Sequence, residues 1–418
     1  MRNDFTVLDM FAGAGGMSEG FFRQKYRFVS HIEKDTYAAT TLMTRAAYHS
    51  LRENNREDVY YEYLKADISR EQLLEEANKF TDTGSVLNYE IREDNEKVII
   101  KNIKERMKAM EVKKIDLIIG GPPCQAYSVI GRSRVGDRIE KDPRNYLFIR
   151  YLSFLKTFAP SIFVFENVPG IRTAIKGKAY LDFVSGAGKL GYYINERILD
   201  ASDFGVLQKR KRIIIIGWRK DMQLTYPEFE NVNHGYMVSS ILSDLPPLTP
   251  GEGMDGVQAY YGPITAYLRR YRLRTKKDVL IHHVARRHNE RDREIYRYVI
   301  AVWDKERRRV KYNELPENLK THKNRTVFED RFKVVASDLP YAQTVTAHIS
   351  KDGHYFIHPD IRQARSITVR EAARIQSFPD NFKFEGPRTA QYRQIGNAVP
   401  PLLSERIAIE MKKMLEAA

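Results

Sequence analysis

The chain has almost no cysteine, with Cys124 alone in 418 residues. One cysteine excludes a framework of disulfides and a metal site built from several cysteines. The sequence also lacks any apolar run near the roughly 18 residues that a membrane span needs, and its first residues lack a signal-peptide pattern. We therefore expect a cytoplasmic protein with no membrane partner and no bound metal.

Acidic residues are too few to balance the basic ones. The chain has 69 Lys and Arg against 54 Asp and Glu, a formal net charge of +15. Residues 262–333 hold 21 basic and 10 acidic residues, so this window alone carries 21 − 10 = +11. Tyrosines are interleaved with the basic residues, a composition that suits nucleic acid. His282, His283 and His288 lie in the window, and without metal-binding spacing we interpret them as polar surface histidines.

The single cysteine stands in GGPPCQAYS, directly after Asp116 and the apolar residues 117–119. A short apolar run that ends in glycines predicts a buried parallel strand, and open α/β sheets bind ligands beyond the carboxyl ends of such strands. Pro122 and Pro123 make the following turn rigid. A thiol on that turn is a candidate nucleophile, and a buried structural cysteine is the alternative.

The first residues predict a cofactor-binding unit. Residues 5–10 indicate a strand, FAGAGG a glycine turn, and a helix begins near Met17. A second strand, residues 27–32, places Glu33 20 residues after Gly13, where an acid accepts hydrogen bonds from ribose hydroxyls. The glycine turn and Glu33 together predict an adenosine-bearing cofactor. The spacing of the glycines is not the GxGxxG of NAD-binding proteins. The alternative is a Glu33 that faces solvent.

Between this unit and the cysteine the pattern is less regular. We predict a helix over residues 38–53 and a third strand near residues 60–66, with Asp67 and Ile68 at its end. Residues 69–114 form a long connection, to which we assign no chemistry.

Two further stretches predict charged groups near the cysteine. Residues 161–165 form an apolar strand that ends at Glu166, where a carboxylate is costly to bury unless it is paired or protonated. QKRKR opens another strand, and alternation along it places Arg210 and Arg212 on one face, where two guanidiniums can hold a carboxylate or a carbonyl oxygen. The alternatives are an ion-paired structural glutamate and a surface basic cluster. The polar residues 129–145 predict a mobile cover over the site.

Six ordered blocks resemble the DNA (cytosine-5)-methyltransferases, in particular those of bacterial restriction–modification systems. The blocks are FAGAGG from Phe11, GPPCQAYS from Gly121, ENVPG from Glu166, QKRKR from Gln208, REAARIQSFP from Arg370 and QIGNAVPP from Gln394. The resemblance implies S-adenosylmethionine as methyl donor, S-adenosylhomocysteine as product, and a cytosine flipped out of double-stranded DNA as acceptor. It also implies a monomer that acts in the bacterial cytoplasm, associated with the nucleoid, separately from any cognate restriction endonuclease.

The resemblance also implies roles for individual residues. Cys124 would add to carbon 6 of the cytosine, Glu166 would hold ring nitrogen 3 and the exocyclic amine, and Arg210 and Arg212 would hold the carbonyl oxygen and steady Glu166. The implied cofactor contacts are Phe11, Gly13, Gly15, Gly16, Glu33, Asp67, Ile68, Pro122 and Asn397, with Asp67 and Ile68 beside the adenine. Thr344 resembles a threonine that contacts phosphate in the family.

We therefore expect an α/β fold whose doubly wound, mostly parallel, Rossmann-like sheet is joined to a second, smaller domain. Residues 1–225 would form the first part of the catalytic and cofactor-binding domain and residues 226–360 the target-recognition domain. Residues 361–389 would form a hinge, and residues 390–418 would return to the catalytic domain.

Three other functions were weighed. A zinc nucleobase deaminase is excluded because Tyr127 stands where the second ligand cysteine would be. A relative that only binds nucleic acid would be expected to lack Cys124 or Glu166, and neither is lacking. The RNA-acting branch of the same family is disfavoured by the large basic region, and an assay with tRNA against duplex DNA decides it.

Overall fold

The computed structural model describes residues 5–80, 83–122, 147–173, 177–320 and 329–418. The predicted nucleophile, Cys124, and the predicted cover over residues 129–145 lie outside the described residues.

Within the described residues, the centre of the molecule is a seven-stranded sheet in the order β3-β2-β1-β4-β5-β7-β6. The strands are β1 (Thr6–Met10), β2 (Arg27–Ile32), β3 (Val86–Leu87), β4 (Leu117–Gly120), β5 (Ile162–Asn167), β6 (Tyr192–Asp200) and β7 (Lys211–Arg219). The pairs from β3 to β5 are parallel, whereas β7 is antiparallel to both β5 and β6. The predicted α/β class with a mostly parallel sheet is confirmed.

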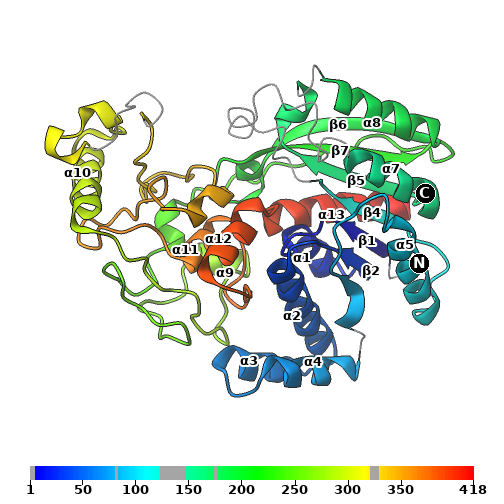
Figure 1. Cartoon of the computed structure of the whole chain (residues 1–418), viewed down its shortest axis with the longest axis horizontal. Helices are drawn as coiled ribbons and strands as arrows, with labels where there is room; N and C mark the ends of the chain where they lie inside the picture. The colour runs from blue at the N-terminus through cyan, green and yellow to red at the C-terminus, as the bar shows by residue number, and fades with distance from the viewer. Residues whose placement is uncertain (1–4, 81–82, 123–146, 174–176, 321–328) are drawn as a thin grey trace.

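Helices cover both faces of this sheet (Figure 1). One face packs against α1 (Gly16–Arg23) and α13 (Pro401–Glu416), and the other against α5 (Glu96–Ala109), α7 (Leu147–Phe158) and α8 (Lys178–Lys189). Alternation along the strands produces the two cores: Val164 of β5 belongs to the first, and Phe163 and Phe165 belong to the second. The sheet is therefore doubly wound, with its strands buried on both sides.

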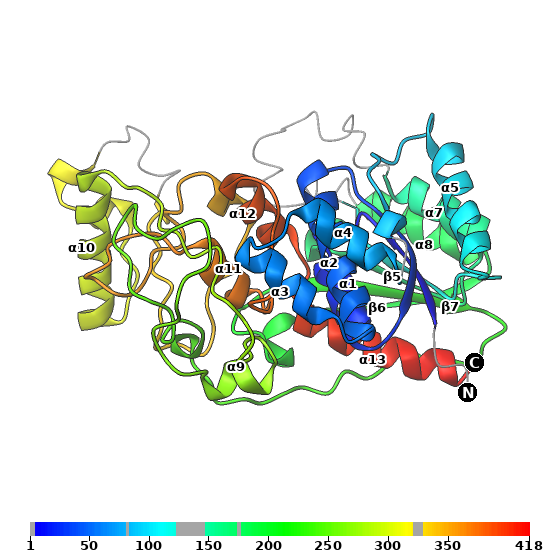
Figure 2. The same ribbon diagram turned by 90° about the horizontal axis from the view of Figure 1, so that it is seen from below.

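The other half of the described chain is rich in loops and extends away from the sheet to α10 (Figures 1 and 2). Its helices are α9 (Ala266–Arg270), α10 (Glu290–Glu306), α11 (Val369–Ile375) and α12 (Arg388–Asn397). Helices α9, α11 and α12 share one hydrophobic core, and α10 belongs to a separate, outer core. The segment that we expected to be a hinge, residues 361–389, thus contributes α11 to the first of these cores.

One element differs in type from the prediction. Residues 60–66 do not form a third strand, because they lie in α3 (Glu57–Lys65), which follows α2 (Thr36–Glu53) and precedes α4 (Arg70–Asn78). The tyrosines favour a strand by propensity, but Val59, Tyr60 and Tyr63 recur at helical spacing and are buried together. The third strand of the sheet is the two-residue β3, so the long connection over residues 69–114 contributes a strand to the sheet in addition to α4 and α5.

Candidate active site

A cavity of about 420 Å³ opens at the carboxyl ends of the parallel strands. The register aligns these ends, since Met10 of β1 pairs with Gly120 of β4, and Gly120 pairs with Phe165 of β5. The turns that follow the strands therefore meet at one edge of the sheet, as ligand sites in open α/β sheets do. The volume is in the range of small-molecule and cofactor sites.

Glycines allow the strand ends to come this close. A Cβ on Gly121 would lie 2.1 Å from the carbonyl oxygen of Glu166, and a Cβ on Gly16 would lie 2.4 Å from the carbonyl oxygen of Val399. Neither contact can be relieved by a side-chain rotation, because both partners are backbone atoms. Gly120 and Gly121 thus pack β4 directly against its neighbours at the cavity wall.

Glu33 is placed where the sequence predicts it, on the cavity wall just beyond β2. Its carboxylate accepts hydrogen bonds from the backbone N–H of Gly13 at 2.7 Å and of Asp35 at 2.7 Å. Burial raises the pKa of Glu33, and the two backbone donors oppose this shift. The carboxylate therefore fixes the glycine turn and still has acceptor capacity toward the cavity.

Asp9 also lines the cavity, although the sequence analysis did not select it. It is 1% exposed, its Oδ2 accepts a hydrogen bond from the Ser18 hydroxyl, and its Oδ1 has no hydrogen-bond partner in the described structure. Burial raises the pKa of Asp9 to about 8. An acid inside the apolar strand β1, directly before a glycine turn, is the signal that could have identified it.

Glu166 and Arg212 form an ion pair at the cavity, with Arg212 Nε 2.7 Å from Glu166 Oε1. Their side chains are 15% and 13% exposed, so the pair is accessible from the cavity. The next residue, Asn167, is buried and donates from Nδ2 to the carbonyl oxygen of Pro122 at 3.2 Å. The carboxylate is thus held beside the turn that continues toward Cys124.

Arg210 has different surroundings from those we predicted. Its side chain is 1% exposed and does not line the cavity. The guanidinium donates to the backbone carbonyl oxygens of Val345 at 2.7 Å, Gly396 at 3.1 Å and Ala398 at 2.8 Å. The structure therefore does not place Arg210 beside Arg212 as alternation predicted, and of the two arginines only Arg212 lines the cavity.

The predicted cofactor residues divide into two groups. Phe11, Gly13, Gly16, Glu33, Pro122 and Asn397 line the cavity, and Gly15 adjoins it at the start of α1 with a φ of 87°. Asp67 and Ile68 do not line it, because they follow helix α3 and not a strand of the sheet. The place that we had assigned to Asp67 and Ile68 is taken by Glu90 and Ile91, which line the cavity three and four residues beyond the end of β3.

Several other residues of the cavity wall were missed. They include Tyr89, Leu147, Val168, Arg393 and Gln394. Glu90 and Ile91 form an acid–isoleucine pair like that of Asp67 and Ile68, but they follow the short strand β3. The two residues of β3 were too few to identify the strand by its periodicity.

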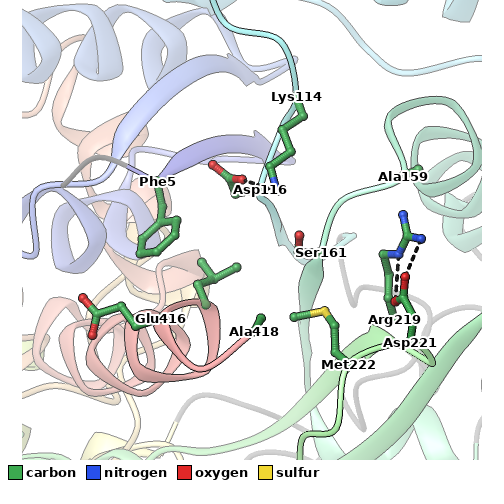
Figure 3. A pocket seen from close by; sticks show the side chains of 11 residues that line it. Phe5, Lys114, Asp116, Ala159, Ser161, Arg219, Asp221, Met222, Glu416 and Ala418 are labelled. Carbon is green, nitrogen blue, oxygen red and sulfur yellow. Dashed lines mark hydrogen bonds and ion pairs between the residues drawn. The ribbon is translucent and has the colours of Figure 1, made fainter. Parts of the chain in front are cut away.

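A larger hollow, of about 560 Å³, lies at the amino ends of the strands, on the opposite edge of the sheet (Figure 3). Four of the five charged side chains in its lining are matched in pairs, Lys114 with Asp116 at 3.1 Å and Arg219 with Asp221 at 2.8 Å; the fifth is Glu416. Asp116 also accepts from the Thr6 backbone N–H and hydroxyl, both at 2.9 Å. These groups satisfy one another, so we place the chemistry at the smaller cavity.

The loop-rich half also differs from the prediction in detail. His282 and His283 are buried and not surface residues: the first accepts from the Phe384 backbone N–H at 3.1 Å, and the second contacts Thr368 and the carbonyl oxygen of Pro246. Across the described ranges, no cluster of three or more His, Cys, Asp and Glu side chains could hold a metal ion. None of the helices within those ranges combines the length and apolar character that a membrane crossing needs.

Comparison with known proteins gives consistent matches. The family model described as C-5 cytosine-specific DNA methylase matches residues 85–413. The chain is 43% identical to the type II methyltransferase M.Bpa9945I of Bacillus paralicheniformis, over 98% of this chain and 99% of the relative. It is 31% identical to the type II methyltransferase M1.HphI of Haemophilus parahaemolyticus, over 98% and 87%. A solved E. coli prophage protein, described as a DNA modification methyltransferase, shares the fold with a TM-score of 0.66 at 20% identity, over 99% of both chains.

Proposed function

The chain belongs to the family of C-5 cytosine-specific DNA methylases, and from this membership we propose that it methylates carbon 5 of a cytosine flipped out of a specific duplex sequence. The methyl donor is S-adenosylmethionine, and the biological role is that of the modification enzyme in a type II restriction–modification system. The enzyme acts as a monomer, separately from a cognate endonuclease.

The cavity suits an adenosine-bearing sulfonium donor. Its wall offers the carboxylate of Glu33 for ribose hydroxyls, the Gly13–Gly16 turn for close backbone approach, and the unpartnered Oδ1 of the buried Asp9. Glu90 and Ile91 are the proposed neighbours of the adenine, and Asn397 is a further proposed cofactor contact in the cavity wall. When bound, S-adenosylmethionine supplies an electrophilic methyl group.

The ion pair of Glu166 with Arg212 is the observation that most supports this chemistry. Carbon 5 of cytosine is a poor nucleophile until a thiolate adds to carbon 6 and makes the ring enamine-like. We assign that thiolate to Cys124, which follows the wall residue Pro122 by two positions. Glu166 binds ring nitrogen 3 and the exocyclic amine, and Arg212 holds Glu166 and the carbonyl oxygen of the base. Once carbon 5 carries the methyl group that the donor would supply, loss of its proton to water and elimination of Cys124 as the thiolate would release the methylated base.

Target choice is assigned to residues 226–360, as the charge distribution suggested. Several basic side chains there are paired with acids, for example Arg308 with Glu314 at 2.7 Å, so only some of the basic side chains are available to phosphate, while the net excess of positive charge remains. Residues 361–389 belong with this segment as its support, since Arg374 of α11 contacts Asp244 at 2.5 Å and Asp380 at 2.6 Å. Thr344, whose hydroxyl donates to the carbonyl oxygen of Lys209 at 2.5 Å, is a candidate phosphate contact next to the catalytic half.

Bisulfite sequencing of DNA from cells that express the chain tests the activity, because methylated cytosines resist conversion. We expect methylation at one recurring sequence and none in cells expressing Cys124→Ser. Purified wild type should also form a covalent adduct with duplex DNA containing 5-fluorocytosine, since the fluorine cannot be eliminated. Substantial turnover by Cys124→Ser would refute the assignment of the nucleophile, and methylation of tRNA in preference to duplex DNA would refute the substrate class.

A further inference from the structure

Arg210 joins three segments that are far apart in the chain. Its guanidinium reaches the carbonyl oxygen of Val345 from the loop-rich half, and those of Gly396 and Ala398 at the end of α12. Helix α12 and the start of α13 lie between the sheet and the loop-rich half (Figure 1). The arginine therefore sits at the junction of the two halves, behind the cavity.

Each of these contacts is adjacent to a residue of the proposed site. Gly396 and Ala398 are the two neighbours of Asn397, which lines the cavity and is exposed. Val345 follows Thr344, the candidate phosphate contact. Arg210 itself stands two residues before Arg212, the partner of Glu166. One buried guanidinium thus fixes the backbone on both sides of Asn397 and the backbone next to Thr344.

A second connection runs beside the first and uses amides. Gln208 accepts from the Val345 backbone N–H at 2.6 Å and donates to the Gln376 side chain at 2.8 Å. Gln376 in turn donates to the carbonyl oxygen of Ile395 at 2.7 Å. Backbone hydrogen bonds of Lys209 and Leu207 with Ala342, at 3.0 and 2.9 Å, align the segment along residues 207–209. The position of residues 342–345 and that of residues 395–398 are consequently set by the same few side chains.

We propose that Arg210 is a positioning residue that couples the DNA-facing segment around Thr344 to the cofactor-facing Asn397. The proposal rests on the proposed function, in which Asn397 contacts the cofactor. Arginine suits this role because its planar guanidinium presents donors in several fixed directions, whereas the single ammonium of lysine cannot reproduce the fork. Arg210 acts on the reaction through the backbone, and not by touching the base.

Calorimetry with S-adenosylhomocysteine on the full chain tests the proposal. Arg210→Lys should weaken binding roughly tenfold, the cost of losing hydrogen bonds made by a charged donor, and should raise the KM for S-adenosylmethionine as well as lower kcat. The matched control is Arg370→Lys: Arg370 is equally buried and donates to three backbone carbonyl oxygens away from the cavity, those of Ile281 at 3.2 Å, Pro379 at 3.0 Å and Phe382 at 3.0 Å. The control should lower the free energy of unfolding but leave cofactor binding unchanged.

The double variant separates positioning from a general structural effect. If Arg210 acts through Asn397, Arg210→Lys combined with Asn397→Ala should bind S-adenosylhomocysteine as Asn397→Ala does, within roughly twofold. Two outcomes would overturn the inference. One is that the effects of the two substitutions on binding add fully in the double variant. The other is that Asn397→Ala weakens binding while Arg210→Lys alone leaves it unaltered. Unaltered binding by Asn397→Ala would instead show that the proposed cofactor contact is wrong, and the inference with it.

Hydrogen exchange on wild type gives a test that needs no variant, should Arg210→Lys not fold. Residues 341–346 do not line the cavity, so the cofactor product cannot cover them directly. We expect S-adenosylhomocysteine, added without DNA, to slow amide exchange both in peptides covering residues 394–399 and in peptides covering residues 341–346. Slower exchange in residues 394–399 alone would overturn the coupling.

Discussion

Asp9 makes stability depend on pH in a predictable direction. Burial raises its pKa from the ordinary value of 3.8 to about 8 in the folded chain. Between these two pH values Asp9 is ionised in the unfolded chain and protonated in the folded chain. The free energy of unfolding therefore falls as the pH rises. The contribution of the protonated form is fully present below about pH 4 and is lost by about pH 8. Asp9→Asn removes this dependence, because an amide does not titrate.

The size of this change in the free energy of unfolding follows from the interval between the two pKa values of Asp9. One pKa unit corresponds to about 1.4 kcal/mol, and allowing for partial ionisation near pH 8, the free energy of unfolding of wild type should fall by about 2 kcal/mol relative to Asp9→Asn between pH 6 and pH 8. Urea unfolding of both proteins at several pH values measures this difference, in which the other titrating groups cancel. Ser18→Ala removes the hydroxyl that lowers the pKa of Asp9, and should extend the loss to higher pH. If the difference in unfolding free energy between wild type and Asp9→Asn stays constant from pH 6 to pH 8, the reasoning is refuted.

Three further changes test the site. Glu33→Gln should weaken S-adenosylhomocysteine binding by about 1–3 kcal/mol, the cost of a weakened buried acceptor, with duplex affinity in the absence of cofactor as the control; equal cofactor affinity by calorimetry counts against the ribose contact. Gly121→Ala places a Cβ 2.1 Å from the Glu166 carbonyl oxygen, so we expect a loss of about 1–3 kcal/mol in unfolding free energy and a lower kcat, whereas wild-type kinetics would mean that the two strand ends separate freely. Exchange of residues 226–360 for those of a relative should move the methylated sequence in bisulfite sequencing, and an active chimera that keeps the original target contradicts the assignment.

The sheet and one edge of the site could be predicted because both depend on local pattern. The apolar run before Gly120 gives β4, and the strand, glycine turn and acid at Glu33 give the first cofactor unit. Parallel strands bring their carboxyl ends to the same edge, so the prediction that Glu33 and Glu166 share one cavity needed only their positions after strands. These residues were found because each follows a strand that its own local sequence pattern identifies.

Asp67 and Ile68, which we expected beside the adenine, do not line the cavity, and the reason is the opposite one. β3 has two residues, Val86 and Leu87, and the sheet itself supplies its stability through pairing with His31 and Ile32 of β2. A strand of this length has no periodicity to detect, whereas the tyrosines of α3 carry strong strand propensity. The sequence rule therefore selected the acid after the wrong segment, Asp67, although the expected pattern of acid and isoleucine stands at Glu90 and Ile91.

Arg210 and Arg212 show why the alternation of side chains along a strand cannot predict different surroundings for two arginines that are two residues apart. Strand β7 begins at Lys211, so the rule of alternate faces applies to Arg212 but not to the residue just before the strand. The carbonyl oxygens that bind Arg210 lie 135, 186 and 188 positions along the chain from it. Only the folded arrangement of the two halves brings them to the guanidinium. A buried arginine held by backbone carbonyls leaves no mark on the sequence of its partners, because every residue carries a backbone carbonyl oxygen. The distinction between an arginine that pairs with Glu166 and one that fixes Asn397 therefore exists only in three dimensions, and the double variant of Arg210 and Asn397 is the measurement that detects it.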